Sequence, residues 1–311
     1  MKMIFNCLIS LFLISISSGI AAQNRTTDTS ATCISFWKNK EAKVYQISHS
    51  KEKFNAAKVS TSSQATYEAY IKVIDSTETG FTIEWVYKNF KSGGIADNTI
   101  NSLNAILEGM KIIYKTDDVG MFTELINWKE VKDFSIGNYE KAVAKQNTDK
   151  EFVAALSQIK AIFQSKENIE ALLIREIQLL HSPYGVEYTK SGIVTETELP
   201  NVTGGAPFPA SIVLKLEELN KQKDYCRVSL NQTIDKGKAG PIMAAILKKL
   251  SGSKEVDEAE INSQIKDMEI SDLNSFTYSI LGGWMSKVVY KRIANIGVIK
   301  SIETYEITEK N

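Results

Sequence analysis

The chain has 311 residues with 37 basic and 37 acidic side chains, and it is 43% hydrophobic and 24% charged. These values are typical of an ordinary globular protein and exclude a disordered chain, a collagen-like repeat and a small disulfide-rich scaffold. The balanced charge also argues against nucleic-acid binding, because such proteins normally carry a basic excess that neutralises phosphates.

The N-terminus has the three parts of a secretory signal. Lys2 supplies a positive charge, residues 4–16 are mostly apolar, and small residues follow at 17–22. The apolar run is shorter than the roughly 20 residues of a membrane-spanning helix, which makes an uncleaved anchor the weaker alternative. We therefore expect a signal peptide over residues 1–22 and a mature chain over 23–311 that is periplasmic or secreted. No membrane span is expected after signal cleavage.

The three cysteines are Cys7, Cys33 and Cys226. A lipoprotein needs a cysteine at the cleavage point, and neither Cys7 nor Cys33 lies there, so lipidation is not expected. Cys33 and Cys226 are candidates for one disulfide, because an exported chain meets an oxidising compartment. Two buried free thiols are the alternative, since the sequence does not place the two Cα atoms within the roughly 7 Å that a bridge needs.

Alternating apolar residues predict hairpins in the first third of the mature chain. Residues 43–54 alternate weakly, as in an edge strand, whereas residues 67–73 and 81–87 alternate strongly on either side of a turn that ends at Gly80. This pattern is typical of a hairpin with one buried face. The next expected elements are a helix over residues 100–110 and a second hairpin over residues 111–116 and 121–126.

A helical block is expected over residues 127–181. Three helices are expected in it, opening at Asn127, at Thr148 and near Ile169. The first two have the spacing of a capping box, with Glu130 and Glu151 three residues after the capping side chain. Their amphipathic faces must be buried against another layer, which we expect to be the sheet.

Strands resume after the helical block. They are expected at residues 186–189, 192–199, 211–219, 225–234, 268–280, 284–294 and 298–308, with one helix over 237–250. Because most strands arrive as hairpins rather than singly between helices, the pattern argues against a parallel α/β fold. We predict an α+β fold in a single domain: a long, curved antiparallel sheet (a partial barrel) with helices packed on one face.

Candidates for catalysis are few. The chain has two histidines, His49 in the expected edge strand and His181 at a helix end, and neither has a second ligand at metal-binding spacing. Carboxylates are plentiful, but none is marked by spacing as the acid and base of a glycosidase. The glycine-rich turn at 237–241 lacks the pattern of a phosphate loop. We therefore expect no catalytic residue, metal site or cofactor.

Aromatic residues gather on strands that border the expected helices. Most are expected to be core, and the alternative is that some line an apolar cavity between sheet and helices. The residues expected to contact a ligand there lie on the first strong hairpin and on the facing helix: Phe81, Ile83, Trp85, Ile169, Leu173 and Ile177.

A resemblance rests on residues 33–37 (Cys-Ile-Ser-Phe-Trp), Tyr67–Trp85, Tyr114–Asp117 and Asn127–Glu130. Together these segments resemble uncharacterised secreted proteins of Gram-negative bacteria, a family that implies export and no known activity. The order of elements is also loosely similar to the half-barrel of periplasmic lipoprotein carriers. This second resemblance transfers no functional residue. The chain differs from the carriers in its long helical block, so the layout does not by itself imply an open lipid groove.

Three functions follow as hypotheses. The first is a non-catalytic exported protein that binds an apolar or lipid-like molecule between sheet and helices. The second is an accessory protein of the envelope that binds a protein partner and has a filled core. The third is a hydrolase whose site the sequence does not mark. An apolar cavity would favour the first, an exposed apolar patch the second, and convergent carboxylates with shifted pKa values the third.

Overall fold

The computed structural model describes residues 26–55, 58–93, 107–145, 163–199, 206–250, 268–296 and 299–310, with single residues 259, 263 and 266. Three expected elements lie wholly or mostly outside these ranges: the signal peptide over 1–22, the helix over 100–110 and the helix that opens at Thr148.

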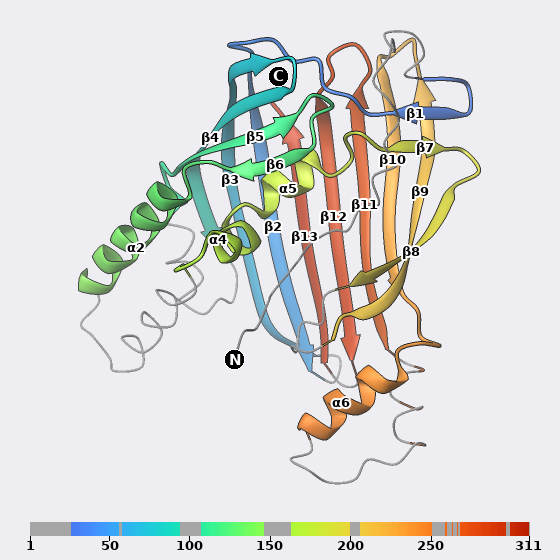
Figure 1. The fold of residues 1–311 in the computed structure, drawn as a ribbon. Helices are drawn as coiled ribbons and strands as arrows, with labels where there is room; N and C mark the ends of the chain where they lie inside the picture. The colour runs from blue at the N-terminus through green and yellow to red at the C-terminus, as the bar shows by residue number, and fades with distance from the viewer. Residues whose placement is uncertain are drawn as a thin grey trace.

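One large open sheet dominates the described chain (Figure 1). Its order is β1-β7-β9-β10-β11-β12-β13-β2-β3-β4-β5-β6, and β8 pairs with β9 beside this path. Strands of the first half are β1 (Ser30–Thr32), β2 (Ala42–Asn55), β3 (Lys58–Thr77), β4 (Gly80–Gly93), β5 (Lys111–Asp117) and β6 (Phe122–Leu125). Those of the second half are β7 (Glu187–Thr189), β8 (Ile193–Leu199), β9 (Phe208–Asn220), β10 (Tyr225–Ile234), β11 (Glu269–Ser279), β12 (Met285–Ile296) and β13 (Ile299–Glu309).

The sheet is mixed, because β7 and β9 pair in parallel while the other named strand pairs are antiparallel. The predicted antiparallel sheet is therefore seen for all but one of these pairs. Helices are few beside so much strand, so the molecule is mainly a β structure and only roughly an α+β one.

Strand β2 corrects one prediction. Residues 43–54 were expected at a sheet edge, but β2 lies in the middle of the sheet, between β13 and β3. Its weak alternation has a physical cause: Tyr45 and Ile47 are buried, whereas His49 and Lys51 continue the same face with polar side chains. The partner that makes β2 central, β13, comes from the other end of the chain, where local pattern carries no information about pairing.

The described helices are α2 (Trp128–Lys145), α4 (Lys166–Leu173), α5 (Arg175–His181) and α6 (Gly240–Leu250). The expected helix near Ile169 is two helices, because Ile174 leaves the helical conformation with φ −124° and ψ 27°. Ser165 caps α4 by accepting a hydrogen bond from the amide of Asn168 at 3.2 Å. None of the helices in the described ranges is both long and apolar enough to cross a membrane.

The cap expected at Asn127 also differs from the structure. Its side-chain oxygen accepts a hydrogen bond from the amide of Ile113 on β5 at 2.7 Å, rather than from an amide in the first turn of α2. Its side-chain amide donates to Glu130 and to the carbonyl of Lys111, both at 3.1 Å. Asn127 therefore fastens the start of α2 to strand β5.

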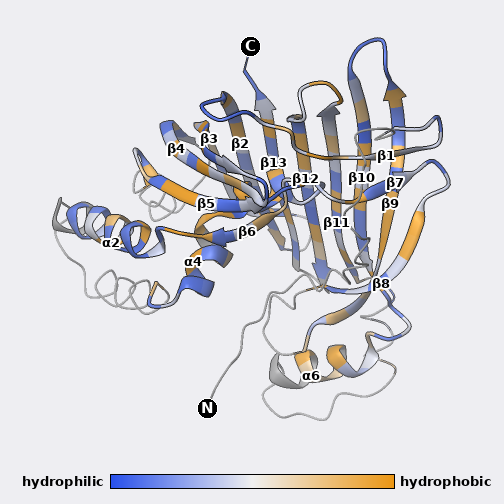
Figure 2. Cartoon of the chain, turned by 45° about the horizontal axis from the view of Figure 1, so that its top comes forward, coloured by the Kyte–Doolittle hydropathy of each residue, from blue (hydrophilic) through white to orange (hydrophobic). Residues whose placement is uncertain are grey.

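Two apolar clusters lie on the helix-bearing face of the sheet, which we call the inner face. The main cluster is rich in aromatic residues and joins α4 and α5 to strands β2–β5 and β10–β13. The second cluster joins α6 to β8–β11. Figure 2 shows an apolar stretch on α6, which agrees with this burial. Figure 1 places α5 near one end of the long strands and α6 beyond the other.

Candidate functional site

A row of polar side chains crosses the inner face between the two apolar clusters. Each member pairs directly with the next across two neighbouring strands, from β10 to β3. We call these residues the polar row: Gln232, Asp272, Arg292, Glu303, Lys51 and Ser63. The four central members alternate in charge. Direct partners on neighbouring strands lie close enough for their side chains to interact.

The central members are paired with one another. Arg292 Nε lies 3.6 Å from an Asp272 oxygen, and Lys51 Nζ lies 3.8 Å from Glu303 Oε1. Side-chain exposure rises steadily along the row, from 7% at Asp272 and 15% at Arg292 to 24% at Glu303 and 41% at Lys51. The row is therefore enclosed at β11 and open to solvent at β2.

An aromatic rung lies directly beside the polar row, on the side of the main cluster. Tyr290 and Tyr305 are partners between β12 and β13, and His49 is the partner of Tyr305 on β2. The His49 ring stacks on Tyr305 at 4.0 Å between ring centroids, and its Nε2 donates a hydrogen bond to Glu303 at 2.9 Å. On the other side of the row, Ile234 and Ile270 belong to the second cluster.

Helix α5 brings a further cation to the row. The Arg175 guanidinium lies 4.9 Å from the centre of the Tyr290 ring, a cation–π distance. Burial by itself would lower the pKa of Arg175, but the neighbouring Tyr290 and Asp272 raise it. Arg175 thus stays charged at the enclosed end of the row.

The two carboxyl groups of the row differ in pKa. Burial raises the pKa of Asp272, against the opposing effects of Arg292, Arg175 and the hydroxyl of Tyr290. Burial would also raise the pKa of Glu303, but the hydrogen bond from His49 and the charge of Lys51 bring it below its usual value. Burial also raises the pKa of Tyr290 to about 12.

Glu176 fixes α5 to the sheet next to this site. Tyr67 on β3 and Tyr87 on β4 both donate their hydroxyl protons to its buried carboxylate, Tyr87 at 3.1 Å. A buried carboxylate is tolerated when charge-assisted hydrogen bonds satisfy it. Because Arg175 precedes Glu176 directly, this attachment also positions the guanidinium over Tyr290.

The six residues predicted to contact a ligand are brought together, but in the main core. Five of them are buried in the main cluster, and Leu173 packs against it: Phe81, Ile83 and Trp85 on β4, Ile169 and Leu173 on α4, and Ile177 on α5. The Trp85 indole N–H is buried and has no hydrogen-bond partner among the described residues.

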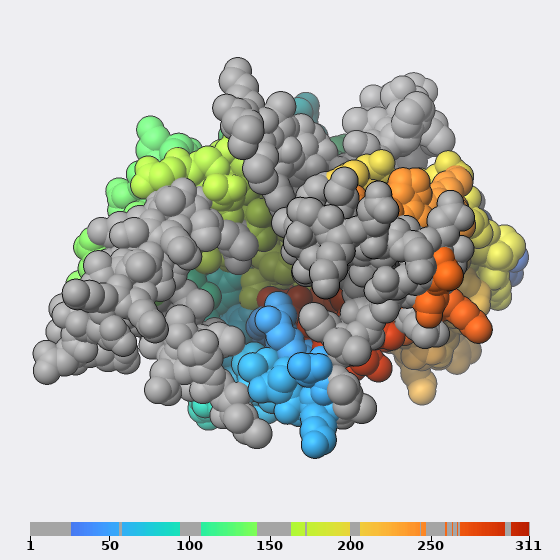
Figure 3. Space-filling model, turned by 90° about the horizontal axis from the view of Figure 1, so that it is seen from below, coloured from blue at the N-terminus to red at the C-terminus, as the bar shows by residue number. Residues whose placement is uncertain are grey.

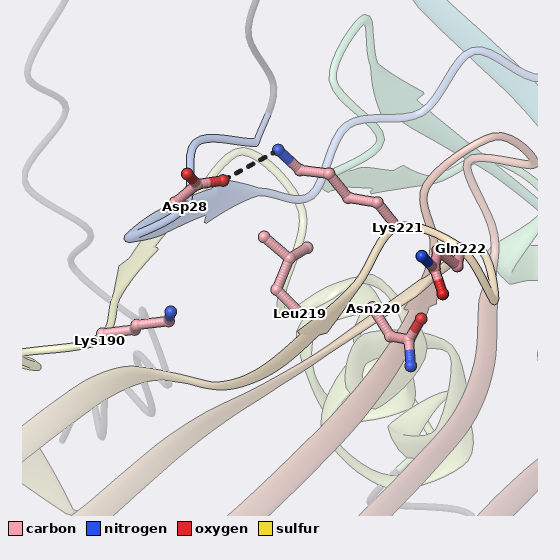
Figure 4. A pocket seen from close by; sticks show the side chains of 6 residues that line it. All are labelled: Asp28, Lys190, Leu219, Asn220, Lys221 and Gln222. Carbon is pink, nitrogen blue, oxygen red and sulfur yellow. Dashed lines mark hydrogen bonds and ion pairs between the residues drawn. The ribbon is translucent and has the colours of Figure 1, made fainter.

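Two surface pockets in the described chain lie elsewhere. The first, in Figure 4, is lined by Asp28, Lys190, Leu219, Asn220, Lys221 and Gln222, with Lys221 paired to Asp28 at 3.3 Å. The second lies over β2, β3 and β4, among lysines and Glu309. Both are open and rimmed by solvent-exposed charges, so neither has the enclosed chemistry of the polar row.

The two histidines have different surroundings. His181 is buried, donates from Nδ1 to the carbonyl of Gly120 at 2.7 Å and accepts at Nε2 from the Tyr114 hydroxyl at 2.8 Å. Burial lowers its pKa to about 4, so it is a neutral part of the core. His49, by contrast, belongs to the site.

Sequence reasoning missed the polar row, although one signal for it was present. On β12 Arg292 lies two residues after the buried Tyr290, and on β13 Glu303 lies two residues before the buried Tyr305. On β2 His49 follows the buried Tyr45 and Ile47 on the same face. Local pattern indicates this change of polarity on each strand. It does not indicate that the polar ends meet in one row.

The chemistry of the row is that of paired charges. No three His, Cys, Asp or Glu side chains within the described residues are placed to hold a metal ion. Charges of both signs lie next to an aromatic rung and between two buried apolar clusters, an arrangement that suits a molecule with a polar group and an apolar part.

Comparison with known proteins adds no relative. No protein-family model matches the chain, and none of the curated proteins matches it.

Proposed function

We propose that the protein is a non-catalytic, exported binding protein whose inner sheet face holds a lipid-like molecule with an acidic polar group. The acidic group contacts the open end of the polar row at Lys51, and the apolar part lies along the strands next to the second cluster and the aromatic rung, whose own side chains are mostly buried. The observation that carries this proposal is the polar row itself, a partly buried line of charges between two apolar clusters.

Energetics support a binding role for the row. Charged pairs removed from water recover little of their desolvation cost, and well-packed apolar residues in their place are often neutral or stabilising. A core built for stability alone would therefore continue the apolar surface of the two clusters across β10–β13. Charges kept at this position are better explained by recognition of a polar group.

Lys51 and Glu303 are the more exposed of the four central members of the polar row, at the end where the proposed ligand binds. In Figure 1, α5 lies near one end of the long strands and α6 lies beyond the other end. In Figure 3, seen from below, atoms of the C-terminal strands are visible behind the end of β2. The exposure of Lys51 and Glu303 agrees with access to the row from this side.

The residues predicted from the sequence have a supporting role in this proposal. Phe81, Ile83 and Trp85 belong to the packed core that holds α4 and α5 in place, and the ligand lies next to this core rather than inside it. The proposed contact surface is therefore displaced along the strands, toward α6.

The first test is native mass spectrometry of mature protein purified from its own envelope, followed by organic extraction. A bound mass that extracts as lipid is expected. A clean protein mass under gentle conditions would contradict the proposal and favour an envelope protein with a protein partner.

A second test uses cis-parinaric acid, a fluorescent fatty acid, and its uncharged methyl ester. The acid is expected to bind, and Lys51→Met to weaken it about tenfold, equivalent to about 1.4 kcal/mol, with little effect on the ester. Lys291→Met is the matched control, because Lys291 is exposed on the opposite face of β12. Equal binding by both lysine variants would exclude the row from recognition.

A further inference from the structure

Cys33 and Cys226 come from distant parts of the chain and meet inside the molecule. Cys33 follows β1, and its backbone pairs with that of Tyr184. Cys226 is the second residue of β10. Both side chains are fully buried, and the structure has them as free thiols. Neither takes part in the polar row or contacts the ligand proposed for it.

Hydrogen bonds hold the segment around Cys33 against the rung that contains Cys226. Tyr278 on β11 is the direct partner of Cys226, and its hydroxyl donates to the carbonyl of Ile34 at 2.7 Å. The amide of Gly185 donates to the carbonyl of Cys33 at 2.8 Å. The residue after Cys33 and the neighbour of Cys226 are therefore in contact.

The two thiols themselves are close. Burial raises the pKa of Cys33, and a hydrogen bond and charge interaction with Cys226 raise it further. Burial raises the pKa of Tyr188 on β7, and both cysteines raise it further. The pairing of Cys33 with Tyr184, the pairing of Cys226 with Tyr278 and the hydrogen bond from Tyr278 to Ile34 thus place the two cysteines in neighbouring parts of the same buried cluster.

We propose that Cys33 and Cys226 form a disulfide while the exported chain folds. The oxidant is a disulfide-donor protein of the exporting compartment. One thiolate attacks the donor disulfide to give a mixed disulfide, and the other thiolate displaces the donor thiol. The protein loses two protons and two electrons, and the donor gains them as a dithiol. Because both cysteines are fully buried, this exchange takes place before the sheet closes over them.

The disulfide fastens the N-terminal segment across the sheet. It closes a long loop that runs from Cys33 to Cys226. Closing a long loop constrains the unfolded chain more than closing a short one. The same segment carries Trp37, whose ring stacks on Trp284 at 4.4 Å and whose indole donates to the carbonyl of Gly283. The bond therefore holds a segment that completes the aromatic core.

The direct test is alkylation of exported mature protein with N-ethylmaleimide in denaturant, followed by peptide mapping. Without reductant, Cys33 and Cys226 are expected to stay unmodified and to appear as one cross-linked peptide pair. After reduction, both are expected to be alkylated. Quantitative alkylation of both residues without reductant would overturn the proposal.

Stability gives a second and separate readout. Cys33→Ala, Cys226→Ala and the double variant are expected to have similar urea midpoints, all lower than that of wild type, because each change removes the same bond. Reductant is expected to lower the midpoint of wild type only. If the decreases in urea midpoint of the single variants add in the double variant, and reductant has no effect on wild type, the two cysteines are separately packed thiols and the proposal is wrong. The disulfide rests on the export that the proposed function includes, but these outcomes do not depend on ligand binding, so the disulfide and the proposed ligand can fail independently.

Discussion

His181 shows how burial of one residue controls the response of the protein to pH. Its folded pKa of about 4 lies below the roughly 6.5 of an unfolded histidine, because burial opposes the charged form. The unfolded chain therefore binds a proton that the folded chain does not bind between these values. The stability that neutral His181 contributes is complete above about pH 6.5 and is lost as pH falls toward 4.

We expect this single group to account for about 3 kcal/mol of the loss in unfolding free energy between pH 7 and pH 4. Urea unfolding of wild type and His181→Gln at both pH values measures it as the difference in pH dependence. Tyr114→Phe is the control: it removes the hydrogen bond to Nε2, and is expected to lower stability by about 1 kcal/mol at both pH values. An unchanged pH dependence in His181→Gln would contradict the assignment.

At the scale of elements, Asn127 connects the helical part of the molecule to the sheet. Removal of its side chain leaves the Ile113 amide without its acceptor, at a position where Asn127 is largely buried. We expect Asn127→Ala to lower the unfolding free energy by about 2 kcal/mol, and Glu130→Ala by less than about 1 kcal/mol because Glu130 is exposed. Thermal and urea unfolding measure both, and a larger effect for Glu130→Ala would favour the original capping interpretation.

Element boundaries were largely predictable, while their partners were not. The strand expected at 225–234 is observed with the same ends, and those expected at 268–280, 284–294 and 298–308 differ from β11, β12 and β13 by one or two residues. These strands alternate strongly, which is a local signal. The break at Ile174 has no local signal, since apolar spacing continues through it from α4 to α5.

At the scale of the whole molecule, the site depends on pairings between strands far apart in the chain. The pattern of its own strand predicts His49 at a solvated edge. In the structure His49 is partly buried, because β13 pairs with β2 and brings Glu303 next to Lys51. The core residues predicted as a ligand surface were recognised correctly as apolar and clustered. The sequence carries no measure of how completely α4 and α5 fill the space above them.

Replacing the Asp272–Arg292 pair is expected to have opposite effects on stability and on binding. Arg292→Met removes the partner of Asp272, which is nearly buried, and is expected to destabilise the fold by about 2 kcal/mol. Combining it with Asp272→Leu replaces the whole pair with apolar side chains of similar size. The double variant is expected to unfold at a urea concentration equal to or above that of wild type, because the desolvation cost of both charges is gone.

The same double variant tests whether the row exists for recognition. Its binding of cis-parinaric acid is expected to fall at least as much as in Lys51→Met, since the alternation of charge that orients Glu303 and Lys51 is broken. Lys291→Met again serves as the control for loss of a cation from the opposite face. Restored stability together with unchanged binding would mean that the row is a structural feature only. Lost binding in a variant as stable as wild type separates recognition from folding, because no defect of the fold remains to explain it.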